Sequence, residues 1–92
     1  MKAIVLVRDG APSEAFEFQD VDMPICSPTQ VMIKVSHFGL NYADIMARKG
    51  LYNDRPELPC VLGYEVVGKI TEVGSEVHGF EIDDLVLGFT LF

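Results

Sequence analysis

The stretch FGLNYADIMARKGLY, from Phe38 to Tyr52, places an amide and a carboxylate at a spacing that could serve chemistry or start a helix. An asparagine can accept a hydrogen bond through its side-chain oxygen while its NH₂ group donates another. Asn41 is a preferred helix N-cap, and Asp44, three residues later, can reach back to it as in a capping box. The local sequence is therefore explained by a helix start, and it requires no catalytic role.

The same stretch also predicts where the helix ends and which face it buries. Arg48 and Lys49 suit the last turn, where the helix dipole favours cations, and Gly50 suits the position after the end. We predict a helix over residues 41–49. Its apolar face is formed by residues spaced three or four apart, namely Tyr42, Ile45, Met46 and Lys49. Tyr42 and Met46 are interpreted as core residues without a catalytic role.

The cysteines and histidines do not predict a metal site. Cys26 and Cys60 lie far apart and give neither a disulfide framework nor metal-ligand spacing, so we expect reduced, partly buried thiols. His37 follows the inward face of a predicted strand and is interpreted as a hydrogen-bonded core or cleft histidine. His78 is expected in a surface turn.

Strand patterns dominate the rest of the chain, which is predicted to be mainly β. We expect strands over residues 3–7, 16–19, 30–36, 64–73 and 85–92. The first is expected to be covered on both faces, the second to be half-buried through Phe16 and Phe18, and the third to point Val31, Ile33 and Val35 inward. Residues 8–14 are expected to form a turn-rich break. Gly68 is expected at a bulge or a close backbone approach.

Length and charge bound the possible partners. The 92 residues have room for one domain, residues 1–92, and the net charge of −7 argues against nucleic acid or an anionic membrane as a partner. The apolar run near the N-terminus is too short for a signal peptide or a membrane span. We therefore expect a cytoplasmic protein with no membrane insertion. The final apolar strand predicts either a pairing chain or a longer natural protein, and the second is favoured.

Two segments carry a resemblance to a known family: Gly39 to Gly50 and Leu58 to Gly74. They resemble the N-terminal GroES-like domain of the medium-chain dehydrogenase/reductase superfamily, in its zinc-independent quinone oxidoreductase (zeta-crystallin-like) branch. The resemblance implies a GroES-like, partly open β-barrel with one short helix at about residues 41–49, incomplete at its C-terminal end. The Rossmann domain of the family is expected to be absent, because the sequence has no G-x-G-x-x-G.

The resemblance also bears on zinc. Zinc-using members of the superfamily have a cysteine where this chain has Asn41 and a histidine where it has Tyr64. Amide and phenol are poor zinc ligands beside thiolate and imidazole, so no catalytic zinc is expected. Family members also carry Gly-Asp-Arg-Val where this chain has Asp83-Asp84-Leu85-Val86, and an aspartate tolerates the turn geometry that glycine provides there.

The activity implied by the resemblance is hydride transfer from NADPH to a quinone or enone. Without a metal, hydrogen-bond donors stabilise the charge that develops on the conjugated oxygen. The chain supplies the substrate side of such an enzyme and is expected to be inactive alone. A second copy of the chain is a further candidate partner, in a homodimer.

The resemblance assigns roles residue by residue, each beside a structural alternative. Asn41 is expected to bind the nicotinamide or the substrate carbonyl, and it also caps the helix. Asp44 is either a helix-terminus residue or a cofactor contact. Tyr52 either donates its hydroxyl near the nicotinamide or is a loop aromatic. Tyr64 either fills the space of the zinc or lines the substrate pocket. Glu65 is expected to form a local hydrogen bond or salt bridge.

The sequence also leaves two other classes of function open. One is a non-enzymatic GroES-like module that stands alone and binds a protein partner through its exposed C-terminal strand. The other is a zinc-binding alcohol dehydrogenase that holds its metal through other ligands.

Overall fold

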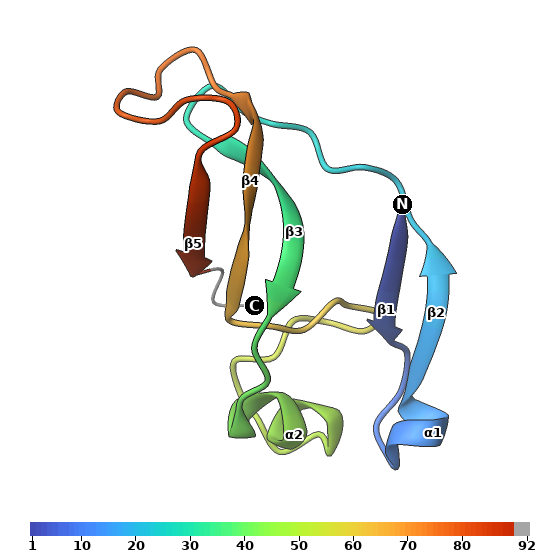
Figure 1. Ribbon diagram of the computed structural model, residues 1–92. Helices are drawn as coiled ribbons and strands as arrows, with labels where there is room; N and C mark the ends of the chain where they lie inside the picture. Colours follow the sequence, from blue (N-terminus) through green and yellow to red (C-terminus); the bar gives the residue numbers. More distant parts are fainter. Residues whose placement is uncertain (90–92) are drawn as a thin grey trace. The chain divides into compact units, whose positions relative to one another are not determined.

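The structure is a computed structural model that describes residues 1–89 (Figure 1). Its elements, in chain order, are β1 (Lys2–Leu6), α1 (Pro12–Ala15), β2 (Phe16–Asp20), β3 (Val31–Phe38), α2 (Tyr42–Arg48), β4 (Glu65–Val73) and β5 (Leu85–Phe89). The strands form two open sheets, β1-β2 and β3-β4-β5. The prediction of a mainly β, partly open fold is therefore confirmed, with two short helices in place of one.

The chain divides into two compact units. The first unit contains residues 1–23 and 40–64, and the second contains residues 24–39 and 65–89. Residues 90–92, the end of the last predicted strand, lie outside the described part of the chain. Each unit is built around one sheet.

In the first unit β1 and β2 pair antiparallel, with Leu6 opposite Phe16. The connection between them, expected to be a turn-rich break, contains α1, a helix of four residues. Pro12 stands at its first turn, where a fixed φ and a missing N–H cost nothing. The N–H of Val7 donates to the carbonyl of Ala15 at 2.8 Å, which closes the connection.

Burial in this unit is uneven along the hairpin. Leu6 and Ala15 are fully buried, whereas Ile4 is 42% exposed and Phe18 is 76% exposed. The prediction that β1 is covered on both faces therefore holds only at its end, where Val5 and Leu6 are buried, and the prediction that Phe18 is half-buried was wrong. The apolar pattern shows which side chains could be buried, and a sheet of two strands leaves much of that surface uncovered.

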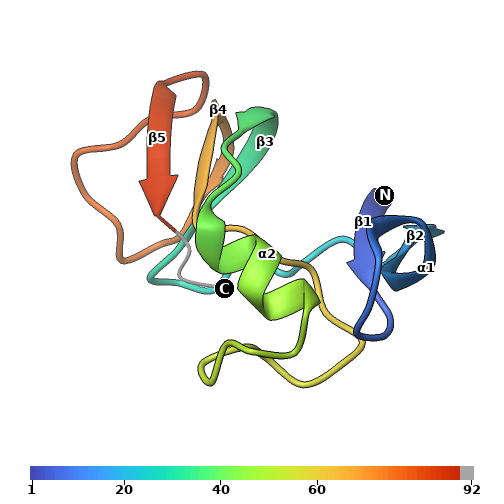
Figure 2. The same cartoon turned by 90° about the horizontal axis from the view of Figure 1, so that it is seen from below.

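Helix α2 begins and ends as predicted, but it buries a different face. Asn41 is its N-cap, Lys49 is its C-cap, and Gly50 follows in the left-handed region with φ of 76°. The predicted core face is wrong at Tyr42, which is 71% exposed. The buried residues are Asp44 and Ala47, and a long loop follows the helix (Figure 2).

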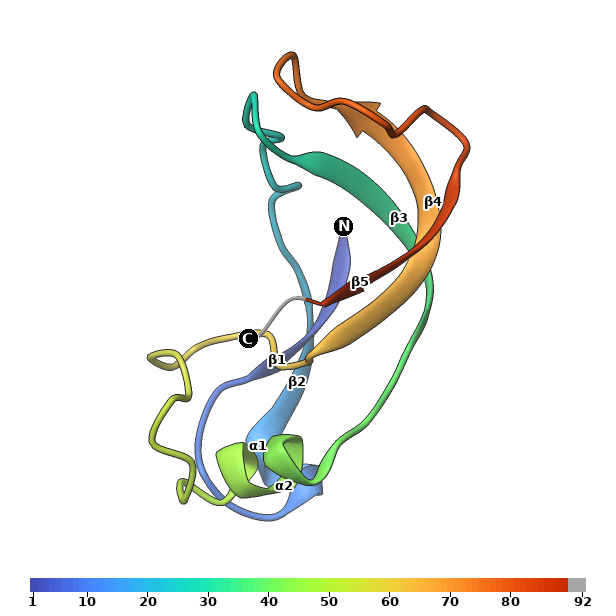
Figure 3. The same ribbon diagram turned by 90° about the vertical axis from the view of Figure 1, so that its left-hand side faces the viewer.

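The second unit is a curved antiparallel sheet with β4 in the centre (Figure 3). Val35 pairs with Gly68 and His37 with Val67, so Ser36 is an extra residue in β3. This irregularity ends the alternation after Val35, and His37 is exposed. Val35 lines the same pocket as Val31 and Ile33, as predicted, but it is 47% exposed. Of the two alternatives for His37, the core position is therefore wrong, whereas a hydrogen-bonded histidine at a cleft is confirmed, because His37 contacts the Ser36 hydroxyl and lines a cavity.

Two local predictions are confirmed in this unit. Asp83 occupies the left-handed region with φ of 76°, as expected for an aspartate in a turn that favours glycine. Gly68 lies at a close backbone approach, because a Cβ placed on it would be 2.2 Å from the carbonyl oxygen of Lys34. The sheet can take no side chain at that point.

We expect Gly68→Ala to lower the free energy of unfolding by about 1–3 kcal/mol, because the β3 backbone must move. Gly88→Ala is the matched control, since a Cβ there would meet only side-chain carbons at 3.4 Å. Urea unfolding of both variants checks this. Equal losses in both variants would contradict the close approach at Gly68.

Candidate functional site

The start of α2 holds the first two candidate residues. The backbone N–H of Asn41 donates to Oδ2 of Asp44 at 2.8 Å, and the N–H of Asp44 donates to the carbonyl of Asn41 at 3.0 Å. Asn41 has extended backbone angles, as an N-cap requires. The predicted helix start is confirmed, and Asp44 acts in it through one of its two carboxylate oxygens.

The other oxygen of Asp44 is unusual. Asp44 is only 8% exposed, and its Oδ1 atom has no hydrogen-bond partner within the described residues. A buried carboxylate oxygen without a donor costs free energy. Asp44 is therefore a helix-terminus residue with one acceptor position still available.

Tyr52 and Tyr64 meet at the two ends of the loop that follows α2. Their hydroxyl groups hydrogen-bond to each other, and their rings pack edge to face with centroids 6.4 Å apart. Both residues are half-buried. The two candidate tyrosines, twelve positions apart in the sequence, thus form one hydroxyl pair.

The environment of this pair raises the pKa of Tyr64 to about 12. The largest cause is the hydrogen bond to Tyr52, followed by burial and by the negative charges of Asp54 and Asp44. Each of these favours the neutral phenol over the phenolate. The Tyr64 hydroxyl therefore keeps its proton throughout the neutral range.

Backbone hydrogen bonds hold both ends of this loop. The N–H of Leu51 donates to the carbonyl of Met46 at 2.9 Å, and that of Arg55 donates to the carbonyl of Tyr52 at 3.2 Å. Farther along, Cys60 pairs with Leu6 through two backbone bonds of 2.8 and 3.1 Å. Cys60 is partly buried, as expected, and burial raises the pKa of its thiol.

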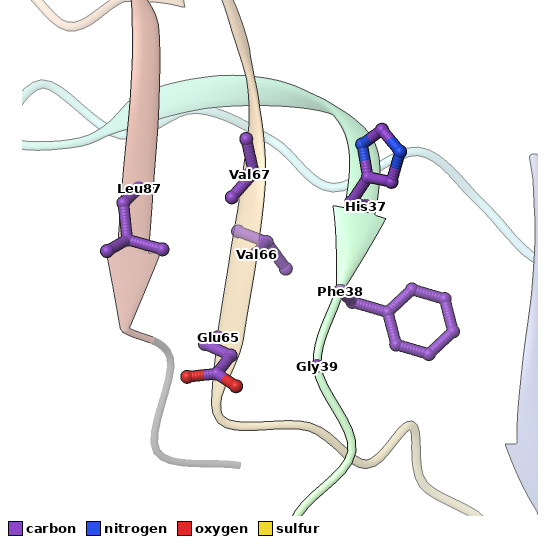
Figure 4. Close-up of a pocket in the computed structure, with 7 residues that line it drawn as sticks. All are labelled: His37, Phe38, Gly39, Glu65, Val66, Val67 and Leu87. Atoms are coloured by element: carbon purple, nitrogen blue, oxygen red, sulfur yellow. The ribbon is translucent and has the colours of Figure 1, made fainter.

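The second unit has a separate cavity of about 320 Å³. It is lined by His37, Phe38, Gly39, Glu65, Val66, Val67 and Leu87 (Figure 4). The Glu65 carboxylate lies against Gly39, where a Cβ would be 2.0 Å from Oε1. The imidazole of His37 contacts the hydroxyl of Ser36 at 3.1 Å. The lining is largely apolar, and Phe38 and Gly39 were not singled out from the sequence.

The structure also bears on metal binding and on membranes. Within residues 1–89, no three His, Cys, Asp or Glu side chains come together as a metal would require. Neither described helix is long and apolar enough to cross a membrane. Of the four predicted site residues, the structure pairs Asn41 with Asp44 and Tyr52 with Tyr64, all in the first unit.

Comparison with known proteins shows the family. Residues 27–90 match the model of the alcohol dehydrogenase GroES-like domain. The chain belongs to this family, which lies within the medium-chain dehydrogenase/reductase superfamily. The relatives of the chain in this superfamily are oxidoreductases. The resemblance identified from the two sequence segments is thereby confirmed.

Three curated relatives illustrate the range of activities. The chain is 35% identical to an NAD-dependent alcohol dehydrogenase of Sulfolobus acidocaldarius, with 95% of this chain and 26% of that protein covered. It is 38% identical to an acryloyl-coenzyme A reductase of Sulfurisphaera tokodaii (95% and 25% covered). It is also 38% identical to a quinone oxidoreductase of Lama guanicoe (94% and 26%). The chain thus spans about a quarter of the length of these relatives.

Solved structures agree with the fold. The human synaptic vesicle membrane protein VAT-1 homolog-like protein matches with a TM-score of 0.91 and 34% identity, over 97% of this chain and 28% of that one. The Escherichia coli quinone oxidoreductase complexed with NADPH matches with a TM-score of 0.86 and 28% identity, over 95% and 26%. The described elements are therefore those of the N-terminal domains of such proteins.

The hydroxyl pair predicts a specific titration. Tyr52→Phe removes the main cause of the raised pKa, so we expect the pKa of Tyr64 to fall from about 12 toward its ordinary value of 10.0. Because the pKa is raised in the folded chain, this contact stabilises fully below pH 10, and its contribution is lost as the pH rises through about 12. Ultraviolet titration of tyrosinate checks the shift. An unchanged titration in Tyr52→Phe would contradict the contact.

Proposed function

We propose that this chain is the substrate-side domain of an NADPH-dependent quinone or enone oxidoreductase that uses no zinc. The observation that carries this function is the hydroxyl pair of Tyr52 and Tyr64, because Tyr64 stands where zinc-using members of the superfamily have a histidine ligand. Relatives named quinone oxidoreductase and acryloyl-coenzyme A reductase support a conjugated substrate.

The hydroxyl pair suits the charge that such a reaction develops. When hydride adds to a conjugated carbonyl compound, negative charge accumulates on the carbonyl oxygen, and a positioned O–H donor stabilises it. The high pKa of Tyr64 keeps its hydroxyl protonated at neutral pH, so the pair, in which one hydroxyl donates to the other, has one O–H left to donate to a substrate and does not act as a base. The half-buried position of both rings limits competition from water.

The start of α2 suits the nicotinamide end of the cofactor, which supplies the hydride when it is bound. The available Oδ1 atom of Asp44 is a buried acceptor of the kind that a carboxamide NH₂ group would satisfy. The side-chain amide of Asn41 lies at the same helix start and can donate to a carboxamide or substrate oxygen. We propose NADPH rather than NADH as the cofactor, because the solved structure of an E. coli quinone oxidoreductase of the same fold is a complex with NADPH.

The residues at the family's zinc positions do not suit zinc. Asn41 and Tyr64 offer neutral oxygen and nitrogen donors, whereas zinc sites use thiolate, imidazole and carboxylate. The same two residues are engaged in the helix start and in the hydroxyl pair. Asn41 and Tyr64 therefore do not support a catalytic zinc at these positions.

We expect Tyr52→Phe and Tyr64→Phe each to lower kcat for NADPH-dependent quinone reduction by about 10- to 100-fold, because one removes the O–H that donates to the developing oxyanion and the other removes the hydroxyl that hydrogen-bonds to that donor. Asn41→Ala is expected to lower the same rate. Tyr42→Phe is the matched control, since Tyr42 lies on α2 and is 71% exposed. The assay uses the protein expressed from the complete gene. No turnover of NADPH with any quinone or enone would refute the function.

A second candidate function rests on β5, which lies at the edge of the three-stranded sheet. Three of its large apolar side chains are exposed, Leu85 by 70%, Leu87 by 61% and Phe89 by 73%. Such an edge can pair with another strand. If the chain is a partner-binding module, we expect the 92-residue chain to sediment as a discrete dimer or complex. Leu87→Pro should abolish this dimer or complex. A monomer of the unsubstituted chain would rule out the dimer.

A further inference from the structure

An ion pair in the first unit ties the loop that carries Tyr52 to the turn after β1. One guanidinium nitrogen of Arg55, Nη1, donates to Oδ1 of Asp9 and also to the carbonyl oxygen of Ala47, the latter at 2.9 Å. The side chain of Arg55 is only 20% exposed, and that of Asp9 is 53% exposed. Arg55 thus joins three segments: the loop, the β1–α1 turn and the last turn of α2.

Asp9 also fits closely against the end of the helix. A Cβ on Gly50 would lie 2.6 Å from Oδ2 of Asp9, and Gly50 already requires a left-handed φ. Arg48 strengthens the same junction, because its Nη1 donates to the carbonyl of Gly10 at 2.6 Å and its carbonyl accepts from the Gly10 N–H at 3.1 Å. The turn at residues 8–10 and the end of α2 are therefore held together on both sides of Gly50.

Tyr52 lies between these two anchors. It follows Gly50 by two residues, and its carbonyl accepts the backbone N–H of Arg55 at 3.2 Å. The backbone of Arg55 thus fixes the turn that begins at Tyr52, while its side chain fixes that turn to Asp9 and α2. Without its side-chain bonds, Arg55 would no longer link the turn that begins at Tyr52 to Asp9 and α2.

We propose that Arg55 and Asp9 are positioning residues that hold the Tyr52 hydroxyl against the Tyr64 hydroxyl. This inference rests on the proposed function for its catalytic consequence only. An ion pair with a half-exposed partner adds little to stability, but a displacement of about 1 Å in a reacting group can cost up to about 100-fold in rate. The effect of the pair is therefore expected in the site rather than in the fold.

The first test is the tyrosine titration of Arg55→Met in the 92-residue chain. We expect the pKa of Tyr64 to fall from about 12 toward 10.0, as the hydroxyl contact loosens. Loss of a cation alone would raise the pKa of a phenol, so a fall reports the contact itself. Arg55→Lys should keep the raised pKa, because both side-chain bonds of Arg55 come from one nitrogen that an ammonium group can replace.

Lys2→Met is the matched control. It breaks an ion pair of the same unit, Lys2–Asp20 at 2.7 Å, whose side chains are each 70% exposed. It should leave the titration of Tyr64 unchanged. If Arg55→Met does not fold, Asp9→Asn tests the same link from its more exposed partner, with a smaller fall in the pKa because an amide oxygen still accepts one hydrogen bond.

The second test is steady-state quinone reduction by the protein expressed from the complete gene. Arg55→Met should lower kcat about tenfold with KM changed less than about twofold, and Arg55→Lys should restore most of kcat. The effects of Arg55→Met and Asp9→Ala on kcat should not add in the double variant. A normal titration together with a normal kcat in folded Arg55→Met would overturn the inference. A lowered pKa in a protein without quinone reductase activity would instead support the positioning role and refute the proposed function.

Discussion

The hydrogen bond between the hydroxyl groups of Tyr52 and Tyr64 is the interaction on which the candidate site depends. It closes the loop between α2 and β4, which is otherwise held by backbone hydrogen bonds at Tyr52 and at Cys60. A loop of this length pays an entropic cost for each closure, so several anchors are needed to keep one geometry. Gly50, which follows α2 in a left-handed conformation, begins the loop two residues before Tyr52.

Local rules predicted much of the backbone. The helix bounds followed from Asn41, Asp44 and Gly50, because capping and left-handed C-termini are decided by a few neighbouring residues. The turn at Asp83 and the close approach at Gly68 were predictable for the same reason. The helix α1 was missed, because a helix of four residues has too little periodicity to be seen beside turn-forming residues.

Burial was predicted less well. Tyr42, Phe18 and Val35 are apolar residues at suitable spacings, yet each is largely exposed in its own unit. Asp44, a charged residue, is buried because it satisfies the first turn of α2. The pattern of apolar residues records which side chains can be covered, and the number of strands and helices around them decides which are covered.

For the site, the helix-start pair was visible in the sequence. The meeting of Tyr52 with Tyr64 was not, because the course of the intervening loop depends on Arg55, Asp9 and the pairing of Cys60 with Leu6.

We propose that a hydrogen-bonded pair of neutral phenols, rather than a Lewis acid, stabilises the charge that develops on the substrate oxygen. The most direct measurement compares NADPH-dependent reduction of a quinone with oxidation of a simple alcohol, both by the protein expressed from the complete gene, before and after prolonged chelation. The hydroxyl pair predicts quinone reduction that chelation leaves unchanged and no alcohol oxidation. Alcohol oxidation that chelation abolishes and added zinc restores would contradict it.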